Sequence, residues 1–274
     1  MKRSKRVVRY TDAAHDDFAG TGVRACEVTA DFDFAPKSLL FRVSSFLLYY
    51  VVAMPLIWFY CHIILGWRIK NRRALRGIGG AYFVYANHSH YSDAFLSPLV
   101  TFPRRSYVVT SPDAVSIKGI RWLVRLLGAI PIPTAPSAAK RYMRAVSQRI
   151  DENACVGVFP EAHIWPFCTF LRPFGSAAFH YPVMKNRPAV AVAVTYQRRK
   201  GLFAAFGTPK RTIYISEPFY PDEALAPKAA QRKLCSQVSD FLAQTLAARS
   251  DYAYVEYIDA SGRDERLDDE SRAV

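Results

Sequence analysis

The most informative residues of this chain are a histidine and an aspartate five positions apart. His88 and Asp93 lie in the segment NHSHYSD, residues 87–93. On a continuous helix, residues five apart point about 140° away from each other and do not meet. The pair meets only if His88 lies in a loop and Asp93 in the first turn of the next helix. Asp93 then accepts a hydrogen bond from one imidazole nitrogen, which leaves the other nitrogen free to remove a proton from a hydroxyl group.

Two further segments fall where the same site would lie. His88 follows a predicted apolar strand, Ala81–Ala86, so it lies at the carboxyl end of that strand, where open α/β sheets bind ligands. Phe159–Glu161 ends another apolar strand, which should place Glu161 at the same edge of the sheet. Gly128–Pro133 is a rigid apolar turn and short strand that follows an amphipathic helix. Each segment alone is a weak signal of function, but the three together indicate a single site at one edge of the sheet.

Strands and helices alternate from residue 81 onward, which predicts a largely parallel sheet with helices on both sides. The strands are predicted at Ala81–Ala86, Tyr107–Thr110, Val156–Phe159 and Ala189–Thr195, with a possible pair at Leu202–Phe206 and Thr212–Ser216. The helices are predicted at Ser92–Thr101, Ile117–Leu127, Ser137–Asn153, Ser176–Asn186 and Pro227–Arg249.

An apolar stretch, Val43–Trp67, contains no Asp, Glu, Lys or Arg. About 20 apolar residues suffice to cross a bilayer, so the stretch is long enough to do so. Pro55 lies at its centre and removes a backbone donor, which predicts a kink or a turn there. Each half then has about 12 residues, roughly 18 Å of helix, which is too short to span the bilayer alone.

Both flanks of this stretch are basic. The positive-inside rule therefore places both ends on the cytoplasmic side of a membrane, with the active site facing the cytoplasm. We expect a re-entrant helical hairpin that dips into the inner leaflet, and the alternatives are one kinked span and a soluble core helix. The basic residues of the flanks are Lys37, Arg42, Arg68, Lys70, Arg72, Arg73 and Arg76.

Composition narrows the range of partners. The chain has 274 residues and a formal net charge of +14, which predicts an anionic partner: nucleic acid, a phospholipid surface or a phosphorylated substrate. The basic residues are spread along the chain without an ordered basic-aromatic motif, so we expect no nucleic-acid partner. The five cysteines are scattered and form no CxxC pair, which argues against a disulfide framework or a zinc ribbon and favours a reducing compartment.

These observations divide the chain into four segments. Residues 1–38 are predicted to be a flexible basic arm, residues 39–76 a membrane-associated helical segment, and residues 77–258 the α/β domain. Residues 259–274 are charged and nearly devoid of apolar side chains, which is typical of a disordered tail. The predicted fold class is α/β, a mostly parallel central sheet flanked by helices, with an N-terminal helical segment inserted in a membrane.

The ordered set of motifs resembles the glycerophosphate and lysophospholipid acyltransferases, typified by 1-acylglycerol-3-phosphate acyltransferase. The resemblance covers roughly Ile69–Pro218, and the order of its blocks is far more specific than any one of them. The matching blocks are NHxxxxD at Asn87–Asp93, GxIPI at Gly128–Ile132, FPE at Phe159–Glu161, a short FxxG-like segment around Arg172–Gly175, and PxVxVAV at Pro188–Val194.

The resemblance implies a reaction and a role for each matched residue. His88 would abstract the proton of an acceptor hydroxyl while Asp93 orients the imidazole. The hydroxyl oxygen would then attack the thioester of an acyl-CoA or acyl carrier protein directly, without a covalent acyl-enzyme, and Glu161 would help to position the acceptor. The substrate-binding residues expected on this basis are Asn87, Ile130, Pro131, Glu161, His163 and Arg172.

The chain departs from the family pattern at two positions. The FPEGTRS block of the family is FPEAHIW here, residues 159–165, so Ile164 stands where an arginine would hold the acceptor phosphate. The arginine that commonly follows the GxIPI block is also absent, with Thr134 and Ala135 in its place. An arginine fork binds phosphate bidentately and isoleucine cannot. Either another cation does this, or the acceptor is not a simple lysophosphatidic acid. The candidate cations are Lys140, Arg141 and Arg172.

We therefore expect membrane-associated transfer of a fatty acyl group to the hydroxyl of a lysophospholipid, with no metal and no cofactor beyond the acyl-CoA or acyl-carrier-protein donor. Two alternatives remain open. A metal-dependent hydrolase would use His88, His90, Asp93 and His163 as zinc ligands. A catalytically silent protein would use only the apolar segment to bind a membrane. His163 and Trp165 are either acceptor-pocket residues or residues that pack under their loop.

Overall fold

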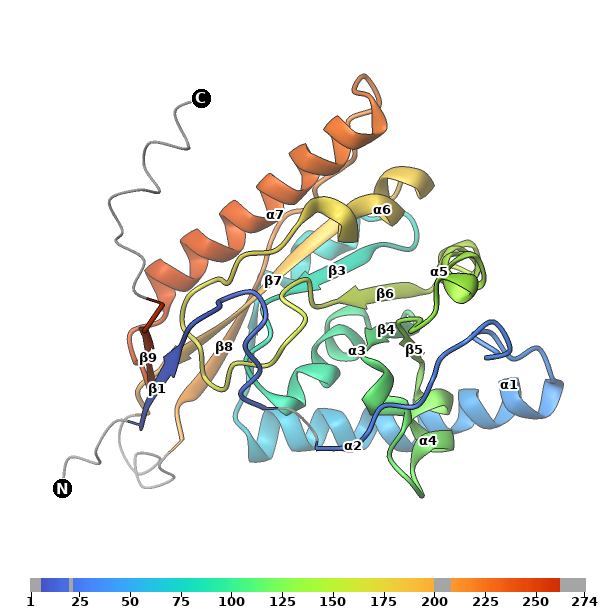
Figure 1. Cartoon of the computed structure of the whole chain (residues 1–274), viewed down its shortest axis with the longest axis horizontal. Helices are drawn as coiled ribbons and strands as arrows, with labels where there is room; N and C mark the ends of the chain where they lie inside the picture. Colours follow the sequence, from blue (N-terminus) through green and yellow to red (C-terminus); the bar gives the residue numbers. More distant parts are fainter. Residues whose placement is uncertain (1–5, 20–21, 200–207, 262–274) are drawn as a thin grey trace.

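The computed structural model describes residues 6–19, 22–199 and 208–261, and its centre is a seven-stranded sheet (Figure 1). The strand order is β2-β8-β7-β3-β6-β4-β5, and every neighbouring pair is parallel except β7 and β8. This confirms the predicted mostly parallel sheet. The strands are β2 (Arg68–Lys70), β3 (Phe83–Ala86), β4 (Ser106–Thr110), β5 (Ala129–Pro131), β6 (Cys155–Val158), β7 (Ala189–Gln197) and β8 (Lys210–Ile215).

Helices cover both faces of this sheet (Figure 1). Side chains alternate between the two faces of a strand, so Val84 and Ala86 of β3 pack into one core while Phe83 and Tyr85 pack into the other. The first core contains α3 and the long N-terminal helix, and the second contains α5 and α7. The helices of the domain are α3 (Leu96–Thr101), α4 (Arg121–Leu127), α5 (Ala139–Asp151), α6 (His180–Lys185) and α7 (Pro227–Arg249).

The apolar stretch before the domain is one continuous helix, Leu39–Ile64, long and apolar enough to cross a membrane. It comprises α1 (Leu39–Phe46), α2 (Met54–Phe59) and π-helical turns before and after α2. The expected re-entrant hairpin at Pro55 is therefore wrong. Just before the proline, Met54 donates its N–H to the carbonyl of Tyr49, five residues back, and this wider turn carries the helix past Pro55 unbroken.

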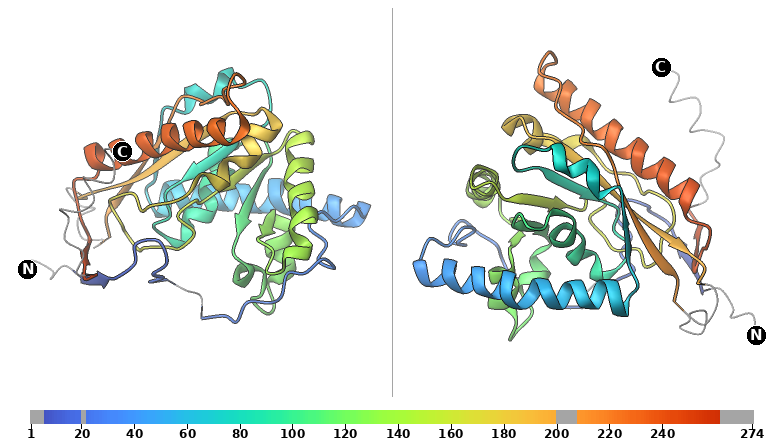
Figure 2. Two further views of the ribbon diagram at one scale, coloured as in Figure 1. Left: turned by 45° about the horizontal axis from the view of Figure 1, so that its top comes forward. Right: turned by 180° about the vertical axis from the view of Figure 1, so that it is seen from behind.

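The long helix lies lengthwise on the domain (Figure 2). Near its start, the Ser45 hydroxyl donates to the carbonyl of Leu126 in α4 (2.6 Å), and the Tyr49 hydroxyl accepts from the N–H of Ser106 in β4 (3.2 Å). Near its end, Cys61 is buried in the core. Most of the remaining helix surface is apolar and exposed, so one face of the helix packs on the domain and the other faces outward. The exposed apolar residues include Leu40, Leu47, Val51, Leu56, Trp58, Phe59 and Ile63.

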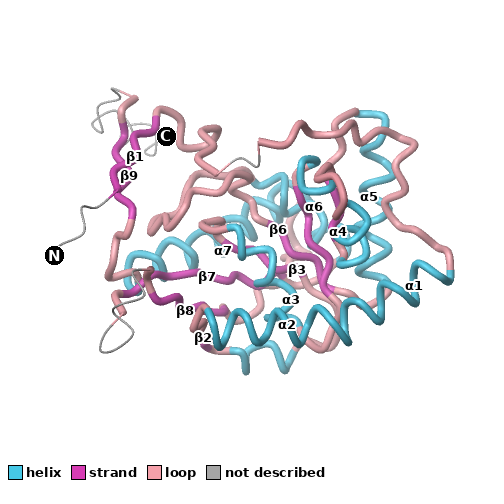
Figure 3. The backbone as a smooth tube through the Cα atoms, turned by 90° about the horizontal axis from the view of Figure 1, so that it is seen from below, coloured by secondary structure: helices cyan, strands magenta, loops and turns pink. Residues whose placement is uncertain are grey.

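The first described residues of the N-terminal arm make long-range contacts with the rest of the chain. β1 (Arg6–Tyr10) pairs in parallel with β9 (Val255–Asp259), so the first and last strands lie side by side, away from the main sheet (Figure 3). The Tyr10 ring lies 4.8 Å from Trp165, and Trp165 Nε1 donates to the carbonyl of Asp16 (2.7 Å). These contacts hold residues 6–16 against the rest of the chain, and the flexibility expected for residues 1–38 stays a prediction.

The boundaries of the other predicted segments also shift. β2 pairs with β8, so the sheet begins at Arg68 and not at residue 77. The predicted tail begins at Asp259, which is the last residue of β9. The rest of that tail, residues 262–274, and the predicted strand at residues 202–206 lie outside the described residues.

Candidate active site

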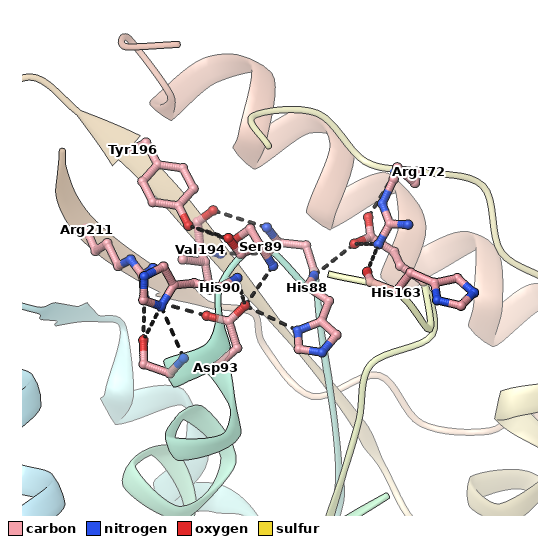
Figure 4. A network of polar contacts seen from close by, with 12 residues as sticks. His88, Ser89, His90, Asp93, His163, Arg172, Val194, Tyr196 and Arg211 are labelled. Carbon is pink, nitrogen blue, oxygen red and sulfur yellow. Dashed lines mark hydrogen bonds and ion pairs between the residues drawn. The ribbon is translucent and has the colours of Figure 1, made fainter. Parts of the chain in front are cut away.

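His88 and Asp93 meet at the carboxyl end of β3 (Figure 4). His88 lies in the loop after the strand, and Asp93 lies in the 3-10 turn Tyr91–Phe95 that leads into α3. His88 Nδ1 is 3.3 Å from Asp93 Oδ2. The Asp93 side chain is completely buried, whereas 15% of the His88 side chain is exposed. The geometry is the one that the five-residue spacing predicted.

Asp93 is the centre of a hydrogen-bond network. Its Oδ2 accepts the backbone N–H groups of Ser89 and His90, each at 2.7 Å, and Arg211 Nη1 lies 3.6 Å from its Oδ1. Burial alone raises the pKa of Asp93, but the hydrogen bond from His88 and the charge of Arg211 outweigh it, and the net pKa is lowered. An ionised carboxylate only accepts hydrogen bonds, so Nδ1 of His88 carries the proton and Nε2 has the free lone pair.

His90 stabilises the turn that contains Asp93. Its Nδ1 accepts the backbone N–H of Ser92 at 3.1 Å, which caps the turn that contains Asp93. Burial, followed by the charge of Arg211, lowers the pKa of His90 to about 4. The ring is therefore neutral at physiological pH, and the nitrogen with the lone pair is already occupied by the cap.

A second loop holds His88 from the other side. Glu161 follows β6, is buried, and accepts the backbone N–H of His88 on Oε2 at 2.8 Å. Farther along this loop, Trp165 N–H donates to the carbonyl of His88 (3.2 Å), and Phe167 N–H donates to that of Ser89 (2.9 Å). Both sides of the His88 backbone are thus fixed by the loop after β6. The ring of Phe159 stacks on the imidazole, with centroids 4.2 Å apart.

Arg172 neutralises Glu161 inside the protein. Its backbone N–H donates to Oε1 at 2.9 Å and its Nη2 to Oε2 at 3.2 Å, and its guanidinium lies over the Trp165 ring. Burial raises the pKa of Glu161, and the charge of Arg172 opposes that rise. The Arg172 side chain is fully buried. Its Nη2 donates to Glu161 and to the carbonyl of His163, and contact of Arg172 with an acceptor stays a prediction.

The comparisons with known proteins address this site. The acyltransferase family model matches residues 68–203. Residues 68–203 therefore form an acyltransferase-family domain. The fold is similar to that of PlsC, the 1-acyl-sn-glycerophosphate acyltransferase of Thermotoga maritima, with a TM-score of 0.51 and 16% identity over 78% of this chain and 98% of that chain. The comparison with curated proteins found no match. The resemblance that the motifs indicated is confirmed.

The acyltransferase motifs come together, but several of their residues are structural in this chain. The Asn87 amide pairs with the backbone of Val194 in β7, through bonds of 2.8 and 3.2 Å. Ile130 lies in the core, and Pro131 is buried at the end of β5. His163 is partly exposed and lies 3.6 Å from Asp17 in the N-terminal arm. Contact of these residues with a substrate stays a prediction.

The hydrolase alternative has no support in the part of the chain that the structure describes. No group of three or more histidine, cysteine, aspartate or glutamate side chains there is placed to hold a metal ion. Of the four proposed ligands, His90 caps the turn and His163 contacts the N-terminal arm.

Sequence reasoning missed two residues that support Asp93. Arg211 of β8 donates to the Ser92 hydroxyl at 2.8 Å as well as lying beside Asp93. Tyr196 of β7 shares a hydrogen bond of 2.8 Å with the hydroxyl of Ser89. The one signal in the sequence was Arg211 itself, an arginine on the inward face of a strand whose inward neighbours, Ile213 and Ile215, are apolar.

His90 predicts a pH dependence of stability. Its pKa is about 4 in the folded chain and near 6.5 in an unfolded one, so the unfolded chain binds more protons between these values. The free energy of unfolding that depends on a neutral His90 is therefore highest above pH 6.5, and it decreases as the pH falls toward 4. We expect urea unfolding to show this decline, and His90→Asn, whose amide oxygen can cap the same turn, to reduce its slope.

The matched control is His15→Asn, since the His15 side chain is 82% exposed. This variant should keep the slope of the wild type. If the free energy of unfolding of His90→Asn depends on pH as steeply as that of the wild type, His90 is not the group responsible for the decline.

Proposed function

We propose that this acyltransferase moves a fatty acyl group from a thioester, acyl-CoA or acyl carrier protein, to the hydroxyl of a lysophospholipid. The observation that supports it most directly is the hydrogen bond between His88 Nδ1 and the buried, ionised Asp93. This bond leaves Nε2 as the free basic nitrogen of the His88 side chain, which is 15% exposed. Membership of the acyltransferase family supplies the reaction class.

The reaction follows from that arrangement. Nε2 of His88 takes the proton of the acceptor hydroxyl as its oxygen attacks the thioester carbonyl carbon. The imidazolium that forms is stabilised by the negative charge of Asp93, which itself stays ionised. As the tetrahedral intermediate collapses, the carbon–sulfur bond breaks, and the thiolate receives the proton from His88. The products are an ester and a free thiol, and the histidine returns to its starting state.

The acceptor differs from a simple lysophosphatidic acid. Ile164 and Thr134 stand at the two positions where the family has arginines, and the Thr134 hydroxyl accepts the backbone N–H of Val28. Of the three candidate cations, Arg172 is buried against Glu161, and Arg141 donates to the carbonyl of Ala30. Lys140 is exposed, but its ammonium lacks the guanidinium fork that binds phosphate bidentately. A headgroup with neutral or cationic character would fit this site better than a bare phosphate, because no guanidinium is free at these positions.

The long helix holds the protein on the membrane that contains the acceptor lipid. Its exposed apolar face fits the acyl region of one leaflet, while its other face is fixed to the domain, so the protein would lie on the membrane without crossing it. The Tyr60 ring near the end of the helix lies 6.3 Å from Phe95, in the turn that contains Asp93. This contact brings the site next to the lipid surface. The basic flanks favour the cytoplasmic leaflet.

The base can be tested by His88→Ala. General-base catalysis contributes about 10²- to 10⁴-fold to a rate, so we expect kcat for acyl transfer to fall by at least about 10²-fold. Initial rates of ester formation in vesicles, read by lipid mass spectrometry, measure it. The control is His15→Ala, which removes an exposed histidine and should retain activity. Near-normal turnover by a folded His88→Ala protein would exclude the mechanism.

The acceptor can be tested with a panel of lysolipids of one chain length. We expect kcat/KM for lysophosphatidic acid to be lower than for at least one of lysophosphatidylcholine, lysophosphatidylethanolamine and lysophosphatidylglycerol. Ile164→Arg should raise the relative rate on lysophosphatidic acid because it adds a phosphate-binding fork, and Ile164→Gln, which adds no charge, should not. A strong preference of the wild type for lysophosphatidic acid would refute the expectation.

The membrane contact can be tested by Val51→Glu combined with Leu56→Glu. Both side chains are 63% exposed, so the fold should tolerate the change. Burial of such a side chain contributes about 1.5–3 kcal/mol, so vesicle binding should weaken at least about tenfold. The matched control, Met184→Glu with Leu225→Glu, alters exposed apolar residues in and beyond α6 and should bind normally. Equal vesicle binding by the two double variants would argue against the helix as the membrane contact.

A further inference from the structure

A second polar site lies at the opposite edge of the sheet from His88. It is a pocket of about 430 Å³, here called the arginine pocket, which is lined by Arg72, Arg73, Arg76 and Arg104. Tyr82, which precedes β3, also lines it, whereas His88 follows β3. Because β3 and β4 are parallel to β6 between them, the arginine pocket lies at the amino ends of these strands and the catalytic pair at their carboxyl ends.

Two of the four guanidinium groups are fixed by the fold. Arg72 Nη2 donates to the carbonyl of Phe102, and Arg104 Nη2 donates to that of Ile78, both at 2.9 Å. The Arg104 guanidinium also lies 5.9 Å from the centre of the Tyr82 ring. A guanidinium carries five N–H donors, so each of these two retains donors for a ligand. Their orientation is set before any ligand binds.

The other two guanidinium groups have no partner among the described residues. Arg73 and Arg76 are exposed, and none of the hydrogen bonds or ion pairs found there involves them. No aspartate or glutamate is among the described residues that line the arginine pocket. Four like charges repel one another when gathered in one place, and a bound anion relieves that repulsion. The charge and the free donors therefore indicate an anionic ligand.

The chemistry of the donors selects the kind of anion. Guanidinium forks match the oxygens of phosphate, which accepts several hydrogen bonds at once. The pocket volume is within the range of about 300–1,000 Å³ that is usual for small-ligand sites. We propose that the arginine pocket binds a phosphate group, which a phospholipid headgroup or a soluble phosphate ester would present, at a site separate from the acceptor hydroxyl.

The surroundings of the arginine pocket favour the phospholipid as the source. Phe102, which lines it, is 45% exposed, and the ring of Tyr50 in the long helix lies 6.5 Å from it. The Tyr50 hydroxyl also donates to the carbonyl of Pro103, another lining residue. The pocket thus adjoins the helix whose apolar face is exposed. A lipid with its tails against that face would place its phosphate at the level of these arginines.

The test compares two double variants of the full chain that lose equal charge. Arg73→Gln with Arg76→Gln removes the two unpaired cations and spares the two that hold backbone carbonyls. Lys228→Gln with Arg232→Gln removes two exposed cations from α7, across the sheet from the long helix. Binding is measured by cosedimentation with phosphatidylcholine vesicles, with and without phosphatidylglycerol. Phosphatidylglycerol should strengthen vesicle binding by the wild type and by the α7 variant. In the Arg73→Gln, Arg76→Gln variant we expect this increase in binding to be lost, so that its affinity for the anionic vesicles falls by about tenfold or more.

A soluble source is tested by titration of inorganic phosphate and of CoA, read as the rise in melting temperature. A rise that the pocket variant loses, together with unchanged vesicle binding, would identify the soluble ester as the ligand. No loss in either assay, or an equal loss in both variants, would overturn the site. None of these measurements requires turnover, so their outcome is independent of the reaction proposed at His88.

Discussion

The rest of the site depends on one buried negative charge, the carboxylate of Asp93. Removing a carboxylate from water costs several kcal/mol, and hydrogen bonds to a charged group offset roughly 1.5–3 kcal/mol each. The chain supplies donors from His88, Ser89 and His90, with the charge of Arg211 close by. These contacts keep the carboxylate ionised, and they also fix the tautomer of the histidine. The contacts that allow Asp93 to be buried as an anion are therefore also the contacts that orient the imidazole of His88.

Glu161 is a second buried carboxylate that the chain stabilises in a similar way. Its buried charge is compensated by Arg172, and its oxygens hold the backbone N–H of His88. An arginine that neutralises a buried carboxylate cannot also reach a phosphate in solvent. Removing either partner would leave an uncompensated buried charge, which typically costs about 3–5 kcal/mol. Glu161 and Arg172 of the matched motifs thus hold the loop that contains His88.

Local signals in the sequence predicted much of this architecture, and contacts between distant residues account for what they missed. The spacing of His88 and Asp93 was sufficient because both lie in one strand-to-helix connection, and the apolar period of Pro227–Arg249 gave the bounds of α7 correctly. The turn predicted at Pro55 is wrong because a wider helical turn before the proline accommodates its missing backbone donor. Residues 6–19 mix charged and apolar side chains without a clear apolar period, so their contacts with Trp165 and β9 have no local signal in the sequence. Arg211 reaches Asp93 from 118 positions away, and no local pattern records that contact.

The long helix contacts residues beside both polar sites. Tyr50 contacts Phe102 beside the arginine pocket, and Tyr60 contacts Phe95 beside Asp93. These tyrosines are ten residues apart, about 15 Å along the axis at 1.5 Å per residue. If the exposed face of the helix lies in a lipid leaflet, both edges of the sheet meet the same headgroup layer, one with a base and the other with cations. Phosphate held at the amino edge would then fix the tilt of the domain, and this tilt determines how far His88 stands above the hydroxyl groups of the membrane lipids.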